Sequence, residues 1–203
     1  MFRHFVLFNF ILFITVILSG CSKNNDNNNL NVNLPSQIVK IKGKFIAVIP
    51  EKKLVLKKKF KSDDCESWAV KIDLDSVYKD SLIRLLYEMF EDVKISFNKL
   101  SRTEIENNNY IAQIEIIHGD AISTFETIDN IGKFNINMNS RIIVEGNKNY
   151  ESSVFSNNSW EKNVYLSCYL NQGANKASKL ALERLLNQIH DSTYESVFKL
   201  KRY

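Results

Sequence analysis

Hydrophobic positions along this chain change their period several times, and each change predicts a different element. Around Gly43, over Leu54–Phe60 and again at Trp68–Leu74, the pattern is typical of β-strands. Between Asp75 and Phe90 the apolar residues recur every three or four positions, which predicts a helix with one buried stripe, capped by its first Asp or Ser. Alternation returns at once in Val93–Phe97. The folded part therefore starts with strands, a helix and another strand.

The second half of the chain predicts more strands than helices. Short segments rich in Gly, Asn and Asp favour tight turns between four strand-like runs, 110–117, 121–128, 134–144 and 150–155. In the third run, Phe134, Ile136 and Met138 alternate with three asparagines, so we expect this strand to have one face in water. A helix follows over Ala174–Ile189, and a shorter piece over Tyr194–Leu200 closes the chain.

Together these elements predict an α+β fold in which two helices pack on one face of a mainly antiparallel sheet. Short links such as His118–Asp120 favour an antiparallel meander, because a parallel pair needs a longer crossover. The polar segment 101–109 is expected to be a simple connection. The chain after residue 37, roughly 165 residues, suits one domain with a single core.

The first residues follow a pattern of their own. Arg3 and His4 precede an almost unbroken apolar run from Phe5 to Leu18, which ends in Leu-Ser-Gly-Cys at Cys21. A basic region, an apolar run and small residues before a cleavage point are typical of a secretory signal. The run is about 14 residues long, shorter than the roughly 20 that a membrane-spanning helix needs. We therefore expect a signal peptide over residues 1–20.

Leu18–Cys21 resembles the lipobox of bacterial lipoproteins. That resemblance implies that Cys21 becomes the first residue of the mature protein and carries acyl chains such as palmitate. The segment that follows is rich in Asn and poor in large apolar residues, so it predicts a flexible tether. The predicted organisation is a lipoprotein signal peptide over 1–20, an acylated tether over 21–37 and one periplasmic α+β domain over 38–203.

Two further cysteines remain after Cys21. An exported chain meets an oxidising compartment, so Cys65 and Cys168 form a candidate disulfide. Such a bond, closing a long loop, would contribute about 2–4 kcal/mol. The alternative is a pair of buried free thiols, and the sequence leaves both open because it does not give the distance between the two Cα atoms.

Charge adds one local feature. The formal net charge of +4 over 203 residues is too small an excess to indicate nucleic-acid binding. Lysines gather in one stretch that is a candidate contact for an anionic surface: Lys52, Lys53, Lys57, Lys58 and Lys59. The alternative is a solvated strand edge, where lysines discourage edge-to-edge aggregation.

The sequence contains no catalytic or metal-binding motif that we recognise. His118 lies beside a turn glycine and His190 near the end of the last helix, and neither has a partner at ligand spacing. Trp68 and Trp160 are aromatic residues that can stack on a glycan, or serve as a core residue and a loop anchor. We therefore expect no catalytic residues, no metal, no cofactor and no enzymatic activity.

The order of the elements resembles the small bacterial envelope lipoproteins of the YajG type. The resemblance rests on the lipobox, the Asn-Leu-Pro-Ser-Gln exit from the tether, the helix Asp75–Phe90 and the strands that lead to the helix Ala174–Ile189. It spans most of the mature chain as a pattern of elements. A similar strand–helix–strand–helix plan is found in LptE-like lipoproteins, which assist lipopolysaccharide assembly as partners of an outer-membrane barrel.

This resemblance implies an address and an architecture. Ser22 rather than Asp follows Cys21, which in such lipoproteins favours the outer membrane, facing the periplasm. We expect a non-enzymatic lipoprotein, anchored through acyl chains, that binds an envelope partner or supports outer-membrane assembly and integrity. The candidate partners are an outer-membrane protein, lipopolysaccharide or peptidoglycan. The alternative function is an LptE-like assembly factor that binds lipopolysaccharide through the lysine stretch.

Overall fold

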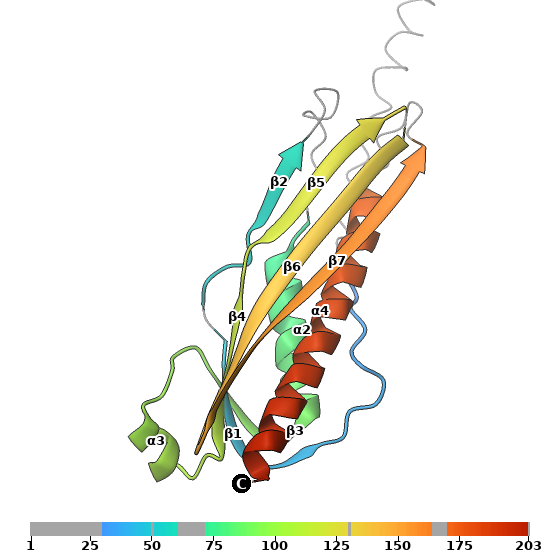
Figure 1. Ribbon diagram of the computed structural model, residues 1–203. Helices are drawn as coiled ribbons and strands as arrows, with labels where there is room; N and C mark the ends of the chain where they lie inside the picture. Colours follow the sequence, from blue (N-terminus) through green and yellow to red (C-terminus); the bar gives the residue numbers. More distant parts are fainter. Residues whose placement is uncertain (1–29, 50, 61–71, 130, 164–169, 203) are drawn as a thin grey trace, which may run out of the picture.

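The computed structural model describes residues 30–49, 51–60, 72–129, 131–163 and 170–202. The chain forms one sheet with helices beside it (Figure 1). The strands are β1 (Ile41–Val48), β2 (Leu56–Phe60), β3 (Phe90–Ser96), β4 (Ala112–His118), β5 (Ala121–Ile128), β6 (Ile131–Glu145) and β7 (Asn149–Asn163). The helices are α2 (Leu74–Met89), α3 (Arg102–Asn107) and α4 (Leu170–Lys201).

The sheet is mixed, which corrects the expectation of a mainly antiparallel one. Its seven strands run in the order β2-β5-β6-β4-β1-β3, with β7 on the other side of β6. β1 lies parallel to both β3 and β4, and β2 lies parallel to β5. Among the described strands, only the pairs that β6 makes with β4, β5 and β7 are antiparallel. The fold class α+β is confirmed.

The prediction of a turn at His118–Asp120 is wrong, and this explains the mixed sheet. Both β4 and β5 pair antiparallel with β6, with His118 opposite Ser140 and Ile122 opposite Asn137. The two strands therefore continue in one direction, with one extra residue between them that forms a β-bulge. Because this strand does not reverse, β1 and β2 can lie parallel to its two halves. Gly and Asp gave the same sequence signal for a bulge as for a turn.

The two long helices lie on the same face of the sheet, as expected (Figure 1). Asp73 caps α2 by accepting a hydrogen bond from the backbone N–H of Ser76, two residues before the first expected cap. The buried stripe of this helix includes Tyr78, Leu82 and Leu86, none of which is exposed. α4 packs on β6 and β7 and is one helix where the sequence predicted two pieces. Both helices share one hydrophobic core with the sheet.

The packed part of the chain begins earlier than residue 38. Val32 is only 3% exposed and belongs to the core, and Leu30 and Leu34 pack against it. Arg84 of α2 donates a hydrogen bond to the carbonyl of Val32 at 2.8 Å, and the backbone N–H of Asn33 donates to Glu183 of α4 at 2.9 Å. The end of the expected tether is thus held against both helices, because its few apolar residues are spaced to reach the core.

Some expectations concern smaller elements. The connection 101–109 contains the short helix α3, which starts with a capping box between Ser101 and Glu104. Most of the strand expected around Trp68 and the segment before Leu170 lie outside the described residues. None of the helices in the described ranges has the length and apolar character that a membrane span requires.

Candidate functional site

One face of the sheet is left open by the helices. Along β6, Phe134, Ile136 and Met138 point toward the helices and are buried, whereas Asn137 and Asn139 lie on the opposite face and are exposed. This confirms the prediction of one wet face for this strand. In Figure 1 both long helices lie behind the sheet, so the open face is turned toward solvent. Its polar side chains are available for a partner.

Strand register brings a group of these side chains together. Ile122 of β5 lies opposite Asn137 of β6, which lies opposite Asn157 of β7. In the next row, Asn139 lies opposite Phe155. A shallow cleft of about 220 Å³ follows these rows, and we call it the amide cleft. Its lining includes Asp120, Ile122, Asn137, Asn139, Phe155, Asn157, Arg184 and Gln188.

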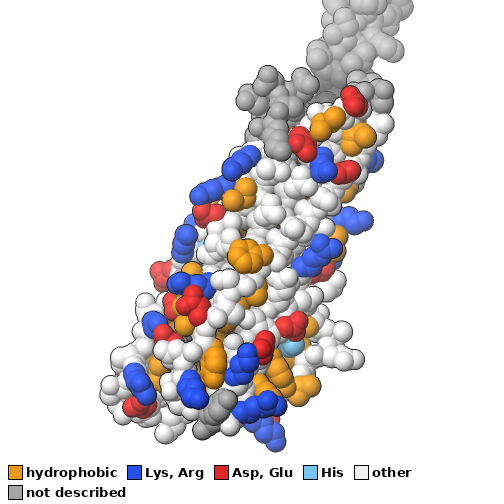
Figure 2. Space-filling view, in the orientation of Figure 1, with side chains coloured by type: hydrophobic (Ala, Val, Ile, Leu, Met, Phe, Trp, Pro, Cys, Tyr) orange, Lys and Arg blue, Asp and Glu red, His pale blue; other side chains and the backbone are white. Residues whose placement is uncertain are grey.

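Phe155 is the exposed aromatic residue of the cleft. Its side chain is 67% exposed, although it lies in the middle of a strand. Figure 2 shows the open face as mostly uncharged polar surface with an isolated hydrophobic group near its centre. A large apolar side chain in water contributes nothing to the core, and single exposed hydrophobics are common. Here its neighbours are amides, so ring and hydrogen-bonding groups share one surface.

The bulge between β4 and β5 positions one of the amides. The backbone N–H of Gly119 donates to the carbonyl of Asn139 at 3.0 Å. A Cβ atom added at Gly119 would overlap the side-chain oxygen of Asn139. The glycine therefore leaves room for this amide to lie over the backbone of the bulge. Sequence position alone does not reveal this contact, because the two residues are brought together by pairing.

The two ends of the amide cleft carry opposite charges. At one end, Asp120 forms ion pairs with Lys57 at 2.5 Å and with Lys52 at 4.0 Å. The hydrogen bond from Lys57 holds the pKa of Asp120 below its ordinary value. At the other end, Arg184 of α4 donates to the carbonyl of Asn157 at 2.8 Å. The cleft thus runs from a carboxylate to a guanidinium.

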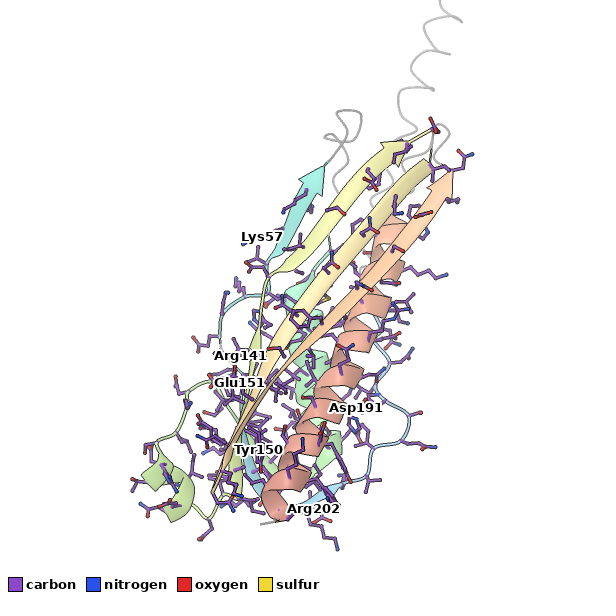
Figure 3. The ribbon with its side chains drawn as sticks, in the orientation of Figure 1. Lys57, Arg141, Tyr150, Glu151, Asp191 and Arg202 are labelled. Atoms are coloured by element: carbon purple, nitrogen blue, oxygen red, sulfur yellow. The ribbon has the colours of Figure 1, made fainter. Side chains whose placement is uncertain are left out.

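Charged pairs also flank the cleft along the strands. Lys133 and Glu161 lie 2.5 Å apart on one side, and Arg141 and Glu151 lie 3.4 Å apart on the other. Figure 3 shows Arg141 and Glu151 together on this face, well below Lys57. Since Lys133 and Arg141 each have a glutamate beside them, the open face presents both signs of charge along β6 and β7.

The predicted lysine stretch lies along β2 and the loop before it, at the edge of the sheet. All five lysines are exposed, so a contact with an anionic surface remains a prediction. Two of them, Lys52 and Lys57, share Asp120 as an ion-pair partner. The positive charge of the stretch is therefore partly neutralised by the carboxylate of Asp120 in the bulge. The spacing of these residues in the sequence did not indicate this.

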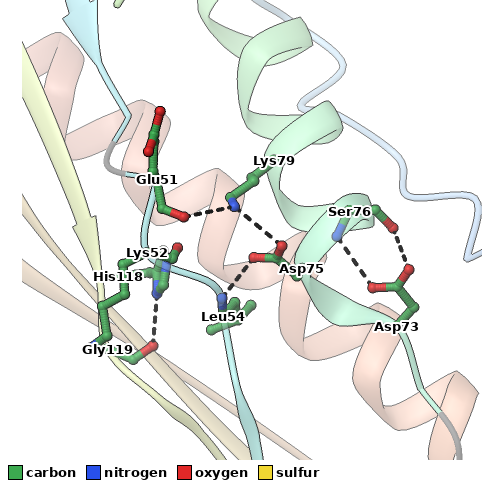
Figure 4. A network of polar contacts seen from close by, with 9 residues as sticks. All are labelled: Glu51, Lys52, Leu54, Asp73, Asp75, Ser76, Lys79, His118 and Gly119. Carbon is green, nitrogen blue, oxygen red and sulfur yellow. Dashed lines mark hydrogen bonds and ion pairs between the residues drawn. The ribbon is translucent and has the colours of Figure 1, made fainter. Parts of the chain in front are cut away.

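His118 takes part in a structural network rather than in an open site (Figure 4). Its side chain is buried, and its ring nitrogens lie 2.7 Å from the carbonyl oxygen of Lys52 and 3.2 Å from that of Gly119. Nearby, Asp75 accepts a hydrogen bond from the backbone N–H of Leu54 at 2.7 Å. Across the described residues, no three His, Cys, Asp or Glu side chains are grouped to hold a metal ion.

Beneath this network lies a buried hydroxyl. Burial raises the pKa of Tyr78 to about 12, and its hydroxyl lies 3.3 Å from that of Ser140 on the helix-covered side of β6. The rings of Tyr78 and His118 are nearly perpendicular, with a centroid distance of 5.5 Å. These polar groups join α2 to the sheet.

A larger cavity of about 480 Å³ lies beside α3, at the opposite end of the molecule from the β5–β6 hairpin. Its polar groups bind one another: Lys99 lies 2.7 Å from Glu145 and 3.6 Å from Glu115. Gln113 accepts from the backbone N–H of Leu100 at 2.7 Å and donates to Glu145 at 3.1 Å. These contacts hold the α3 segment on the sheet.

Several of the expected site residues lie outside the described part of the chain. These are Cys21, Cys65, Cys168 and Trp68. Trp160 is described and packs on the core side of β7, where a Cβ atom added at Gly173 would overlap its indole. It is therefore a packing residue. The sequence analysis did not identify Phe155 or Arg184 as site residues. The alternation of exposed and less exposed positions along β7 was a signal for Phe155, but the sequence held no comparable signal for Arg184.

Comparison with known proteins gives similarity of fold. No protein-family model matches the chain, and no curated protein matches its sequence. A DUF330 protein from Xanthomonas campestris has a TM-score of 0.52 and 9% identity, covering 85% of this chain and 95% of its own. A minor lipoprotein from Acinetobacter baumannii has a TM-score of 0.40 and 11% identity, covering 76% of this chain and 91% of its own.

A neuraminyllactose-binding hemagglutinin homologue from Helicobacter pylori has a TM-score of 0.44 and 7% identity, covering 85% of this chain and 98% of its own. The similarity to the DUF330 protein is the strongest of the three and shows a shared fold. At this identity it does not transfer an activity. The likeness to YajG-type lipoproteins in particular stays a prediction.

Proposed function

We propose that this protein is a non-enzymatic lipoprotein of the bacterial envelope that binds an envelope partner through the open face of its sheet. The observation that carries the anchoring half of this proposal is Leu18–Cys21, a lipobox-like end to an apolar run. Mature lipoproteins carry several acyl chains, and two or more chains give stable anchoring where one is marginal. Ser22 after the cysteine favours the outer membrane.

The open face supports the binding half of the proposal. The helices cover one side of the sheet and take up its apolar side chains, whereas Asn137, Asn139 and Phe155 are exposed on the other side. A non-enzymatic role is supported by how the titratable groups are used. His118 is engaged by backbone carbonyls, and Asp75 and Asp120 are engaged by an N–H and by lysines.

The anchoring half is tested by replacing the proposed acylation site. We expect Cys21→Ala to leave the protein unacylated and absent from the washed outer-membrane fraction, as measured by intact mass and fractionation. Cys65→Ala and Cys168→Ala are matched controls, since each also removes one thiol, and both should stay membrane-bound. A Cys21→Ala protein that remains firmly in the membrane fraction would refute the anchor.

The alternative of an assembly factor that binds lipopolysaccharide through the lysine stretch has less support. Lys52 and Lys57 are paired with Asp120, which reduces the positive field available to phosphate groups. Replacing the five lysines of the stretch by Gln should abolish a salt-sensitive binding to lipopolysaccharide if this alternative holds. Absence of binding by the wild type at low salt would reject it.

A further inference from the structure

We propose that the amide cleft is a binding site for an oligosaccharide, with the ring of Phe155 stacked on one sugar unit. The inference rests on the proposed function, because it names the chemistry of the partner that the open face would bind. It goes beyond that function in assigning the contact to a small set of side chains.

The exposed aromatic ring is the first argument. Phe155 is 67% exposed and lies opposite Asn139 in the β6–β7 pair. A pyranose ring has an apolar face of C–H groups, and such a face packs on an aromatic ring while the hydroxyls point sideways. A site for a purely apolar ligand would be lined mainly by hydrophobic residues, whereas here Phe155, Ile122 and Met138 share the lining with amides and charged groups.

The amides beside this ring supply the second argument. Asn137, Asn139 and Asn157 lie in two neighbouring rows of the open face, and all three are exposed. Each side-chain amide has both a donor and an acceptor. A sugar hydroxyl also gives and receives hydrogen bonds, so amides match it without requiring a charge on the ligand. Asp120 and Arg184 at the two ends add a stronger acceptor and a stronger donor.

The charges around the cleft argue against two other partners. Lys133 and Arg141 are each paired with a glutamate, so the described residues along β6 and β7 mix both signs of charge, whereas an anionic lipid or nucleic acid is attracted by a single positive field. A folded protein would have to satisfy every amide that it covered, because buried unpaired polar groups are costly. The centres of protein interfaces are instead enriched in aromatic residues, and this cleft has one.

The size of the cleft limits the ligand. Its volume of about 220 Å³ is below the roughly 300–1,000 Å³ of sites that enclose a whole drug-sized molecule. The cleft therefore suits one sugar unit of a chain, with the rest of the chain extending over the open surface. In a cell envelope, the same ring chemistry is offered by the glycan strands of peptidoglycan and by the sugars of lipopolysaccharide.

The test is calorimetric titration of the mature acylated protein in detergent micelles. One probe is peptidoglycan glycan strands freed of their peptide stems, and the other is the core oligosaccharide of lipopolysaccharide. We expect sub-millimolar binding of at least one probe, and Phe155→Ala should weaken it about tenfold or more. Phe155→Trp should keep the binding, because it preserves an aromatic face, and Asn139→Ala should weaken it by a smaller factor.

A matched control is Tyr87→Ala, since Tyr87 is an exposed aromatic residue (53%) on α2. It should bind as the wild type does, and Phe155→Ala should unfold at the wild-type temperature. Wild-type protein that binds neither probe at about 10 mM, binding unaffected by Phe155→Ala, or a Phe155-dependent contact with a folded protein alone would overturn the proposal. If one of these outcomes is found but Cys21→Ala still releases the protein from the membrane, the sugar site is refuted and the lipoprotein anchor is supported.

Discussion

The two faces of the sheet are built from the same strands, but one packs against the helices and the other is exposed to solvent. On β6, Ile136 is fully buried under the helices, while its neighbour Asn137 is exposed on the open face. The covered face carries the hydrophobic core, and the open face carries amides, ion pairs and Phe155. The comparison shows that residues one position apart can be separated into those that hold the fold and those that are free to bind.

The largest expected effect is on stability, when an alanine substitution on the covered face is compared with one on the open face. Ile136→Ala should lower the free energy of unfolding by about 2–5 kcal/mol, because it leaves a cavity in the core. Asn137→Ala should change it by no more than about 0.5 kcal/mol. Urea denaturation of both variants measures the difference. Equal losses would show that the open face also contributes to stability and would break the comparison.

A smaller effect is expected on the pH dependence of stability, through the carboxylate of Asp75 on α2. Burial alone would raise the pKa of Asp75, but the hydrogen bond from Leu54 and the charge of Lys79 prevail and lower it. The ionised carboxylate therefore stabilises the fold above its unfolded-state pKa of about 3.9, and this contribution is lost as pH falls through the lower folded-state pKa.

Asp75→Asn tests this by losing about 1 kcal/mol at pH 7, since the charge-assisted bond to a partly exposed group is removed. Its stability should also fall less steeply than that of the wild type between about pH 5 and pH 2. The measurement is thermal unfolding at several pH values. Asp80→Asn, an exposed carboxylate on the same helix, is the control. Parallel pH profiles for Asp75→Asn and the wild type would contradict the assignment.

The smallest effect is expected from an ion pair on the open face. The side chains of Arg141 and Glu151 are 51% and 58% exposed, so water and salt screen their attraction. A double-mutant cycle with Ala at both positions should give a coupling energy of about 0.2–0.5 kcal/mol, reduced further in 1 M salt. A coupling above about 1 kcal/mol would mean that this pair orders the open face more than its exposure indicates.

Local patterns in the sequence predicted most elements of the fold. Of the candidate site, they predicted the exposed asparagines of β6. The alternation in β6 identified both the buried and the wet face, and the apolar stripe of α2 identified the helix. The sequence also contains the capping box of Ser101 and Glu104 that starts α3. These features are readable because side-chain period follows directly from backbone conformation.

Tertiary structure decided what these patterns left open. Whether Gly119 and Asp120 form a turn or a bulge depends on how β4 and β5 both pair with β6, and that choice made the sheet mixed. The same pairing placed Asn139 over Gly119 and beside Phe155, and the packing of α4 brought Arg184 to the cleft. The sequence determined which side chains are exposed to solvent. Long-range strand pairing determined which of them are neighbours, because the energy of pairing depends on residues far apart in the chain.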